Sequence, residues 1–452
     1  MKHYIVSILA AILFLSPCKG FGETPSQEQI TEWRRAAAQG DAGAQYNLGV
    51  AYDHGEGVSQ NYAEAVKWYR LAAAQGDAVA QYNLGVAYDN GQGVRQNYAE
   101  ALKWYRRAAQ QGYALAQFGL GVLYDNGRGV PQDNPEALKW FRLAAQQGYA
   151  SAQYNLGMTY AKGRGVPQDY AEAIKWFRLA AQQGMAEAQY NLGVMYDNGQ
   201  VVTQNDAEAL KWYRLAAQQG VVQAQYRLGE MYSRGQGVTK SNAEAAKWYR
   251  LAAIKGNDNA QTNLGWLYHE GTGVKQDYVE AMKWFRLAAD QKEAFAQNNI
   301  GLMYDEGTGV KQDYAEALKW YHLAAAQGNA YAQSNIGEMY AKGVGVEQDY
   351  PEALKWFRLA ADQKDAGALT WLGWMYEEGK GVKQDSDAAA KWYRLAADQG
   401  KTNALFDIGE MYEKGLGVEK NISTARKWYT KACANGNKKA SERMRVLNGH
   451  KH

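Results

Sequence analysis

Residues 41 to 76 read DAGAQYNLGVAYDHGEGVSQNYAEAVKWYRLAAAQG, and this 36-residue pattern recurs without insertion or deletion as far as residue 436. A Lys-Trp dipeptide holds the same place in every copy, with its tryptophan at Trp68, Trp104, Trp140, Trp176, Trp212, Trp248, Trp284, Trp320, Trp356, Trp392 and Trp428. A fixed period of this length is typical of proteins built from stacked helical units. The sequence therefore predicts eleven repeats of one structural unit.

Each repeat reads as two helices joined by a tight link. In the first repeat, apolar residues spaced for one helical face predict a helix over roughly 42–53. A Gly-x-Gly linker follows, and glycine permits the left-handed backbone of a short turn. Asn61 is a good N-cap for the second helix, and Glu64 would complete a capping box. Gly76 then ends that helix.

A glycine recurs inside the first helix, as Gly49 in the first repeat. Glycine costs about 1 kcal/mol relative to alanine in a helix interior. We therefore expect a large Trp or Tyr ring of the neighbouring helix to approach too closely for a β-carbon. One pair of helices cannot bury both of its apolar faces, whereas stacked pairs share a continuous core.

The chain ends carry partial copies of the repeat. Residues 26–40 match a second helix alone, and residues 437–447 match a first helix in which Arg445 replaces the glycine. We expect an N-terminal capping helix within 23–40, and a C-terminal capping helix and tail over 437–452. The predicted fold class is all-α, an α/α solenoid of eleven 36-residue helix-turn-helix repeats over 41–436.

The repeat resembles a known family. Its motif Ala-Gln-Tyr-Asn-Leu-Gly-x-x-Tyr-Asp-x-Gly-x-Gly-Val, followed by Glu-Ala-x-Lys-Trp-Tyr-Arg-Leu-Ala-Ala-x-x-Gly, is similar to the SEL-one-like repeat (SLR), a relative of the tetratricopeptide repeat. The resemblance covers 41–436 and implies a right-handed superhelical solenoid whose relatives act mostly as adaptors, scaffolds or secreted interaction proteins. Val201 departs from the pattern by replacing the second linker glycine. A cysteine-rich branch of the family shows weak penicillin binding or hydrolysis, but this chain lacks those repeated cysteines.

The first 22 residues predict a signal peptide. A positively charged start precedes a largely apolar run over 5–15, which is too short to cross a bilayer but suits a secretory signal. Small residues favour cleavage after Gly22, with Gly20 as the alternative site. A lipoprotein acylated at Cys18 is a further alternative, although the proline before that cysteine fits the signal poorly. We expect an exported protein, periplasmic or extracellular.

Composition excludes several classes of partner. The 452 residues include 50 Lys plus Arg against 47 Asp plus Glu, which gives a net charge of +3. This balance provides no overall field that would draw the chain to nucleic acid or to an anionic membrane. A hydrophobic content of 46% is typical of a folded protein, and two cysteines are too few for a disulfide framework. No later segment resembles a membrane span.

Motifs for catalysis or metal binding were not found. The Gly-x-Gly of each linker lacks the third glycine and the preceding strand of a dinucleotide-binding fingerprint. His54, His269 and His322 are scattered without partners at metal-ligand spacing. A Ser-x-x-Lys sequence starts at Ser16, inside the predicted signal peptide. We therefore expect a protein that is not an enzyme and that holds no cofactor or metal.

Candidate partner-binding residues come from the variable arc of the first helix. With each repeat numbered from 1 to 36, starting at Asp41, positions 3, 6, 7, 10 and 14 vary widely, whereas the opposite arc is nearly constant. Large aromatics occupy this variable arc at Trp266, Phe295, Tyr331, Trp371 and Trp374. Such residues at partly exposed positions are common interface anchors. The alternative is that they fill gaps between neighbouring first helices.

Two other features of the pattern bear on binding. Position 10 also carries Glu230, Glu338 and Glu410, which indicates a position that is not deeply buried. Asparagine occupies position 7 in seven repeats, and the candidates to hold the backbone of an extended peptide are Asn263, Asn299 and Asn335. A bridge from each amide to the neighbouring repeat is an equal alternative. The recurring Lys67 and Arg70 positions are interpreted as an exposed charged face.

The sequence predicts a non-enzymatic exported scaffold or adaptor that mediates protein–protein or protein–peptide interactions in the bacterial envelope. One alternative is a secreted factor that binds host proteins. Another is a protein that binds or hydrolyses peptidoglycan or β-lactams. The expected partner is a protein or a peptide, with no nucleic acid and no membrane span.

Overall fold

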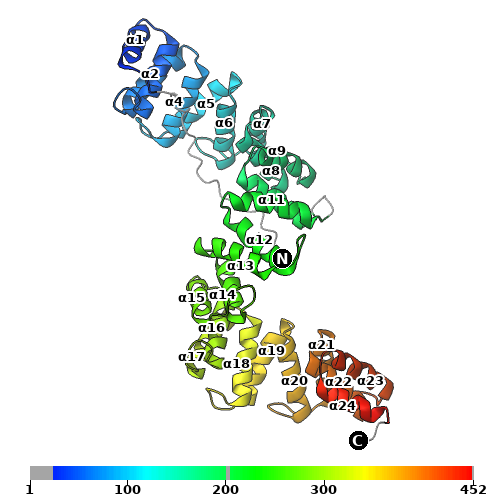
Figure 1. Cartoon of the computed structure of the whole chain (residues 1–452). Helices are drawn as coiled ribbons and strands as arrows, with labels where there is room; N and C mark the ends of the chain where they lie inside the picture. Colours follow the sequence, from blue (N-terminus) through cyan, green and yellow to red (C-terminus); the bar gives the residue numbers. More distant parts are fainter. Residues whose placement is uncertain (1–23, 200–203, 450–452) are drawn as a thin grey trace. The chain divides into compact units, whose positions relative to one another are not determined.

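The structure is a computed structural model that describes residues 24–199 and 204–449. Within these residues the chain forms 24 α-helices and no β-strand. Contacts divide the chain into two compact units, one up to Lys240 and the other from Ser241. The predicted all-α solenoid class is confirmed, and Figure 1 shows helical hairpins following one another within each unit. The predicted signal peptide and Val201 lie outside the described residues.

The helices alternate along the chain. The first helices of the eleven repeats are α2 (Ala42–His54), α4 (Ala78–Asn90), α6 (Ala114–Asn126), α8 (Ala150–Lys162), α10 (Ala186–Asp197), α12 (Val222–Arg234), α14 (Asp258–Glu270), α16 (Ala294–Glu306), α18 (Ala330–Lys342), α20 (Ala366–Glu378) and α22 (Thr402–Lys414). The second helices are α3 (Tyr62–Ala74), α5 (Tyr98–Gln110), α7 (Asn134–Gln146), α9 (Tyr170–Gln182), α11 (Asp206–Gln218), α13 (Asn242–Ile254), α15 (Tyr278–Asp290), α17 (Tyr314–Ala326), α19 (Tyr350–Asp362), α21 (Ser386–Asp398) and α23 (Ile422–Ala434). The capping helices are α1 (Gln27–Ala38) and α24 (Lys438–Leu447).

The helices of the first repeat begin and end at the capping residues that the sequence predicted. One predicted capping interaction is absent. Gly55 ends α2 in the left-handed conformation, at a φ of 73°. At the start of α3, the Asn61 side chain accepts hydrogen bonds from the backbone N–H groups of the next turn at 3.1 Å. The expected second half of the capping box is wrong for this helix. Glu64 accepts from Lys67 instead, because that ammonium offers a charged donor one turn along the exposed face.

A close contact between glycine and an aromatic ring holds the two helices of a hairpin together. A β-carbon at Gly85 would lie 2.5 Å from Cδ1 of Tyr105, which is fully buried. The same approach, at 2.5 to 2.8 Å, occurs in all ten repeats that lie within one unit. The expected close approach is confirmed, and the ring is the Tyr or Phe that follows the Lys-Trp dipeptide rather than the tryptophan.

The same tyrosine is anchored by a carboxylate of the first helix. Tyr105 donates to Asp89 at 3.3 Å, and Tyr69 donates to Asp53 at 3.1 Å. Burial raises the pKa of Asp89, and the hydrogen bond from Tyr105 opposes that rise. In two of the repeats in which the ring is phenylalanine, those of Phe177 in α9 and Phe357 in α19, alanine takes the place of the aspartate. This hydrogen bond therefore forms only in repeats that have both a tyrosine in the second helix and a carboxylate in the first.

Glutamine side chains link many of the hairpins to the preceding helix. Gln75 donates to Oε1 of Gln45 and to the carbonyl of Gly40, both at 2.8 Å. Gln45 in turn donates to the carbonyl of Ala37 at 3.1 Å. The contact between two glutamines recurs at 2.8 to 2.9 Å in seven further repeats. These bonds satisfy carbonyls that a helix leaves unpaired at its end.

Arginine side chains add a second link between successive repeats. Arg70 donates to the hydroxyl of Tyr88 in the next repeat at 2.6 Å. The same pair recurs nine more times in the part of the chain that the structure describes. The interpretation as an exposed charged face is therefore incomplete. Lys67 does lie exposed beside Glu64, but Arg70 also joins two hairpins.

The two capping helices lie where the partial repeats predict them. Ser26 and Gln29 form a capping box at the start of α1, with hydrogen bonds of 3.2 and 2.8 Å. Asn437 caps α24, in which Ala440 is buried and Arg445 is exposed. The charge of Arg445 is tolerated because its side chain is exposed to solvent.

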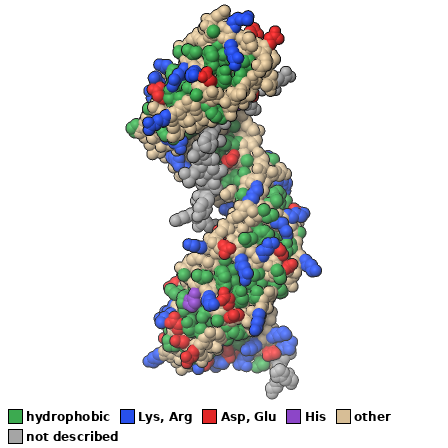
Figure 2. Space-filling view, turned by 90° about the vertical axis from the view of Figure 1, so that its left-hand side faces the viewer, with side chains coloured by type: hydrophobic (Ala, Val, Ile, Leu, Met, Phe, Trp, Pro, Cys, Tyr) green, Lys and Arg blue, Asp and Glu red, His purple; other side chains and the backbone are tan. Residues whose placement is uncertain are grey.

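The face of the molecule in Figure 2 is mixed in charge and also carries hydrophobic side chains. Figure 2 shows Lys and Arg side chains interspersed with Asp and Glu on the face in view, without a large area of one sign. This pattern agrees with the net charge of +3. Among the described helices, none combines the length and the apolar character needed to cross a bilayer.

Replacing Gly85 by alanine tests the glycine–ring contact. The added methyl group must displace Tyr105, and overpacking of this kind costs about 1–3 kcal/mol. This cost outweighs the gain of about 1 kcal/mol from the better helix propensity of alanine. We expect Gly85→Ala to lower the free energy of unfolding, measured by urea denaturation. Gly43→Ala is the control. Its added β-carbon would lie 3.4 Å from the nearest atom, Oδ1 of Asp41, so the variant should stabilise α2. Equal stabilisation by both variants would contradict the account.

Candidate protein-binding site

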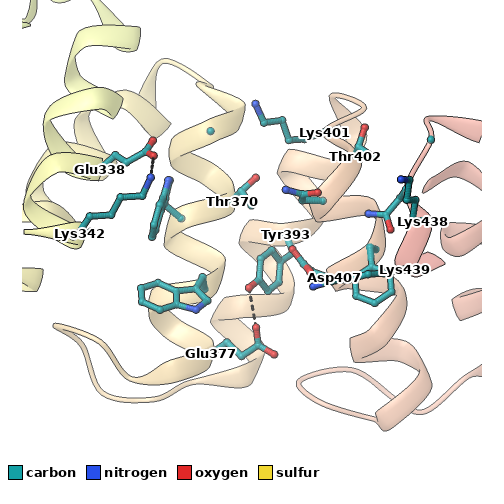
Figure 3. Close-up of a pocket in the computed structure, with 18 of the residues that line it drawn as sticks. Glu338, Lys342, Thr370, Glu377, Tyr393, Lys401, Thr402, Asp407, Lys438 and Lys439 are labelled. Carbon is teal, nitrogen blue, oxygen red and sulfur yellow. Dashed lines mark hydrogen bonds and ion pairs between the residues drawn. The ribbon is translucent and has the colours of Figure 1, made fainter. Parts of the chain in front are cut away.

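A groove of about 1090 Å³ lies in the second unit, among α18, α20, α22 and the start of α24 (Figure 3). Positions 3, 6, 7 and 10 of the tenth repeat all line it, as Gly367, Thr370, Trp371 and Trp374. Position 6 is a large ring throughout the first unit, where Tyr82, for example, packs 5.8 Å from the ring of Tyr105. Threonine at this position leaves space. The variable arc of the first helices thus forms the walls of the groove.

Two predicted aromatics form one wall of this groove. Trp371 stacks on the core ring of Phe357, with ring centroids 5.5 Å apart and planes 9° apart. Trp374 meets Trp371 edge to face at 5.5 Å and lies 6.2 Å from the ring of Tyr350. Both tryptophans are half-buried. They pack against neighbouring helices, as the alternative interpretation expected, and they also line the groove. Their role in partner binding stays a prediction.

The other predicted aromatics lie outside this groove. Phe295 and Tyr331 are 52% and 57% exposed, and their ring centroids are 6.2 Å apart. Trp266 is 41% exposed and stacks on His269 at 5.3 Å. The structure therefore brings Trp371 together with Trp374, and Phe295 with Tyr331, whereas Trp266 packs on a histidine of its own helix. Their role in partner binding stays a prediction.

Carboxylates and a tyrosine from three helices meet inside the groove. The Tyr393 hydroxyl, on α21, donates to Oε2 of Glu377 at 2.8 Å, and Figure 3 shows the Asp407 side chain beside Tyr393. Burial raises the pKa of Asp407 to about 7, with further contributions from Glu377 and Glu410, whereas Lys439 opposes the rise. This carboxyl group therefore titrates near neutral pH.

Lysines surround these acidic groups. Lys342 forms an ion pair with Glu338, and its ammonium lies 5.9 Å from the Trp371 ring centroid. Lys401, Lys438 and Lys439 are exposed where they line the groove. The groove thus combines an aromatic wall, an acidic interior and a basic edge.

The predicted asparagines occupy half-buried positions. Nδ2 of Asn335 donates to Oδ1 of Asn298 in the preceding repeat at 3.1 Å, which is the bridge that the structural alternative described. Asn335 also lines a smaller pocket of about 340 Å³, which shares Glu338 and Lys342 with the groove. Asn263 and Asn299 are half-buried on α14 and α16. Binding of a peptide backbone by these amides stays a prediction.

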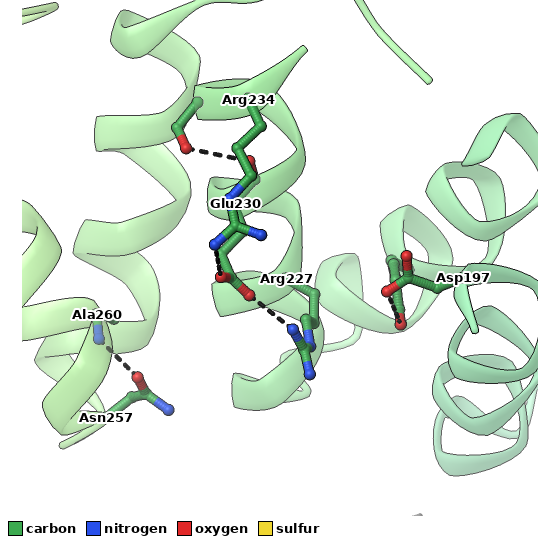
Figure 4. Close-up of polar contacts among 8 residues, drawn as sticks. Asp197, Arg227, Glu230, Arg234, Asn257 and Ala260 are labelled. Atoms are coloured by element: carbon green, nitrogen blue, oxygen red, sulfur yellow. Dashed lines mark hydrogen bonds and ion pairs between the residues drawn. The ribbon is translucent and has the colours of Figure 1, made fainter. Parts of the chain in front are cut away.

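One expectation about position 10 is wrong. Glu230 is only 8% exposed, because Arg227 and Arg234 each bind one of its carboxylate oxygens, at 2.8 and 2.9 Å (Figure 4). Two guanidinium groups allow this carboxylate to be buried. Glu338 and Glu410 are half-buried, as the sequence led us to expect of this position.

Sequence reasoning missed the acidic interior of the groove. Asp407 stands at position 7, where seven repeats have asparagine, and Glu377 stands at position 13, where five repeats have aspartate. Both residues looked like variants of structural positions. The one signal in the sequence that could have indicated an acidic site was the aspartate at Asp407, at a position where most repeats have asparagine. Within 24–199 and 204–449, no three His, Cys, Asp or Glu side chains are grouped as a metal site would require.

Comparison with known proteins identifies the family. A family model for the Sel1 repeat matches eleven consecutive segments, at residues 42–77, 78–113, 114–149, 150–185, 186–221, 222–257, 258–293, 294–329, 330–365, 366–401 and 402–437. The chain belongs to the Sel1 repeat family. The resemblance noted in the sequence is thereby confirmed, and the Sel1 repeats form a scaffold suited to protein–protein interaction.

Solved structures agree with this assignment. A protective antigen present in uropathogenic Escherichia coli strains, which displays an SLR fold, is 38% identical, with 92% of this chain and 90% of that chain covered and a TM-score of 0.84. A Sel1 repeat protein from Oxalobacter formigenes is 37% identical, with 68% of this chain and 89% of that chain covered and a TM-score of 0.53. No protein of curated function matched the Sel1 repeats of this chain.

The raised pKa of Asp407 predicts a pH-dependent stability. Its pKa is about 7 in the folded state, above the value of about 3.9 expected in an unfolded chain. Its contribution to stability is therefore fully present below the unfolded pKa and is lost as the pH rises through 7. The quantity to compare is the melting temperature of Asp407→Asn minus that of the unmodified protein. We expect this difference to be larger at pH 8 than at pH 5.

The melting temperature is to be followed by circular dichroism at 222 nm. Asp398→Asn, at the exposed end of α21, is the control and should leave the pH dependence unchanged. A melting difference for Asp407→Asn that stays constant between pH 5 and pH 8 would show that this carboxyl group does not titrate in the predicted range.

Proposed function

We propose that this Sel1 repeat protein is an exported adaptor that binds peptide segments of other proteins in the groove of its second unit. The observation that carries the proposal is the pair of half-buried tryptophans, Trp371 and Trp374, in a groove built from the variable arc. Aromatic side chains that are already packed lose little conformational entropy when a ligand covers them. Rings held in this way are typical of the residues that dominate binding energy.

A peptide suits the shape and the chemistry of this groove. Its lining combines aromatic rings with hydroxyl, amide and charged groups, so it offers both apolar contact and hydrogen bonds. Short segments of a partner can lie in such a groove in an extended or helical form. Folding of the repeats does not require the tryptophans at positions 7 and 10, because most other repeats have different residues there.

Export is the second part of the proposal. The apolar run over 5–15, followed by small residues up to Gly22, has the pattern of a cleavable secretory signal. We place the mature protein in the periplasm or outside a bacterial cell, in an envelope complex. A secreted factor that binds host proteins is the second candidate. It is favoured by the 38% identical protein of uropathogenic Escherichia coli that is described as a protective antigen.

Peptide selection tests the binding function. We expect the mature protein to enrich specific sequences from a random phage-displayed library. The double variant Trp371→Ala, Trp374→Ala should bind the enriched peptides at least about tenfold more weakly, because truncated hot-spot residues cost about 2 kcal/mol or more. Its helical content should stay intact. Leu395→Ala, which truncates an exposed side chain of the same unit outside the groove lining, is the control and should bind normally.

Equal binding by the double variant would reject the groove as the peptide site. Loss of helical content in the double variant would instead support a packing role for these rings. In that case Asn403→Trp, an exposed position on the groove lining, provides a second test, because a new ring there should block the enriched peptides without disturbing the core.

Fractionation tests export. In a Gram-negative host, we expect the full chain to appear outside the cytoplasm with a mature N-terminus at Glu23, as read by mass spectrometry. A variant without residues 1–22 should stay in the cytoplasm. An intact Met1 on the full-length protein, recovered only with cytoplasmic markers, would contradict the proposal.

A further inference from the structure

Aromatic rings and carboxylates face the same groove from neighbouring helices. Trp371 and Trp374 stand on α20, which also carries Glu377, whereas Asp407 stands on α22 (Figure 3). An aromatic face attracts a cation through its quadrupole, and a carboxylate attracts the same cation by charge. A groove that presents both groups therefore favours a positively charged ligand over a neutral one.

The lysines of the groove do not neutralise its acidic interior. Lys342 is paired with Glu338 on α18. Lys439, on α24, interacts with Asp407, but Glu377 and Glu410 act on the same carboxyl group with the opposite effect. Two carboxylates and burial together outweigh this lysine. Asp407 thus stands in an environment that a further cation would stabilise.

The charge at the edge of the groove has the opposite sign. Exposed lysines line this edge: Lys401 at the beginning of α22, and Lys438 and Lys439 at the beginning of α24. A ligand that complements both regions carries a positive side chain for the interior and negative groups on either side of it. A peptide with arginine or lysine between acidic residues has this arrangement.

We propose that the groove binds an Arg or Lys side chain of a partner peptide, with its charged end against Asp407 and Glu377 and its methylene stem along Trp371 and Trp374. Acidic residues on either side of that cation contact the lysine edge. This inference rests on the proposed peptide-binding function and adds the chemistry that the groove selects.

Binding of a cation is coupled to the loss of a proton from the carboxyl group of Asp407. Burial and the neighbouring carboxylates hold the pKa of Asp407 at about 7, so this group is largely protonated at pH 6 and largely ionised at pH 8. The charged groups that face it are Glu377 on α20, Glu410 on α22 and Lys439 on α24, and the neutral hydroxyl of Tyr393 on α21 also faces it. Because the ionised form binds the cation, the affinity should rise about tenfold from pH 6 to pH 8.

A peptide panel tests the inference on the full mature chain. The probes are fluorescein-Glu-Gly-X-Gly-Glu-amide peptides, labelled on the amino-terminal nitrogen, in which X is arginine, lysine, norleucine or glutamate, and the readout is fluorescence anisotropy. We expect the arginine and lysine peptides to bind at least tenfold more tightly than the norleucine peptide at pH 8. Asp407→Asn should remove this preference and its pH dependence, while norleucine binding stays within twofold. Asp398→Asn is the matched control and should behave as the unmodified protein.

Two results would overturn the inference. One is equal binding of the norleucine and arginine peptides, and the other is tightest binding of the glutamate peptide, which would make the groove an anion site. If Asp407→Asn fails to fold, Glu377→Gln provides a second test, because its amide oxygen can still accept from Tyr393. Failure of the charge preference alone leaves peptide binding in place. Failure of the library selection as well would remove the proposed function.

Discussion

The contact between a glycine of the first helix and a buried ring of the second fixes the geometry of each hairpin. It brings the ring to a distance that no β-carbon permits, as at Gly85 and Tyr105. The glycine weakens its helix by about 1 kcal/mol, and burial of a large side chain contributes about 1.5–3 kcal/mol. Glutamines such as Gln45 and Gln75, which donate to carbonyls of the preceding helix and its end, then hold successive hairpins in register together with the arginine–tyrosine bonds. The remaining face of each first helix is free to vary.

The groove arises from variation within this frame. Position 6 changes from a large ring in the first unit to Thr370, and tryptophans take positions 7 and 10 of the same helix. The glutamine pairing also stops in the last two repeats, where Leu369 and Leu405 are buried in its place. Asp407 replaces an asparagine of the pattern and carries a charge into a partly buried place. A few substitutions at fixed positions thus turn a structural repeat into a surface with its own chemistry.

The sequence predicted the fold almost completely, because a pattern repeated eleven times exposes its own constraints. Helix boundaries, the two capping helices and the close approach at Gly49 all follow from residues that recur at one spacing. The site was predicted only in part. Trp371 and Trp374 were visible as exceptions to the pattern, but the roles of Glu377 and Asp407 depend on which helices meet in space. The buried Glu230 was missed for a different reason, because the two arginines that allow its burial stand near it in sequence, on the same helix α12, and were not recognised as its partners.

Site-specific photo-crosslinking in living cells tests most directly whether the groove holds a partner protein. A photoreactive amino acid at Asn403, an exposed residue that lines the groove, is to be compared with the same group at Leu395, which is 49% exposed on α21 and is not among the lining residues. The account predicts that Asn403 alone crosslinks to a partner, through a segment containing arginine or lysine beside acidic residues. Crosslinks of equal yield from both positions, or from Leu395 alone, would contradict it.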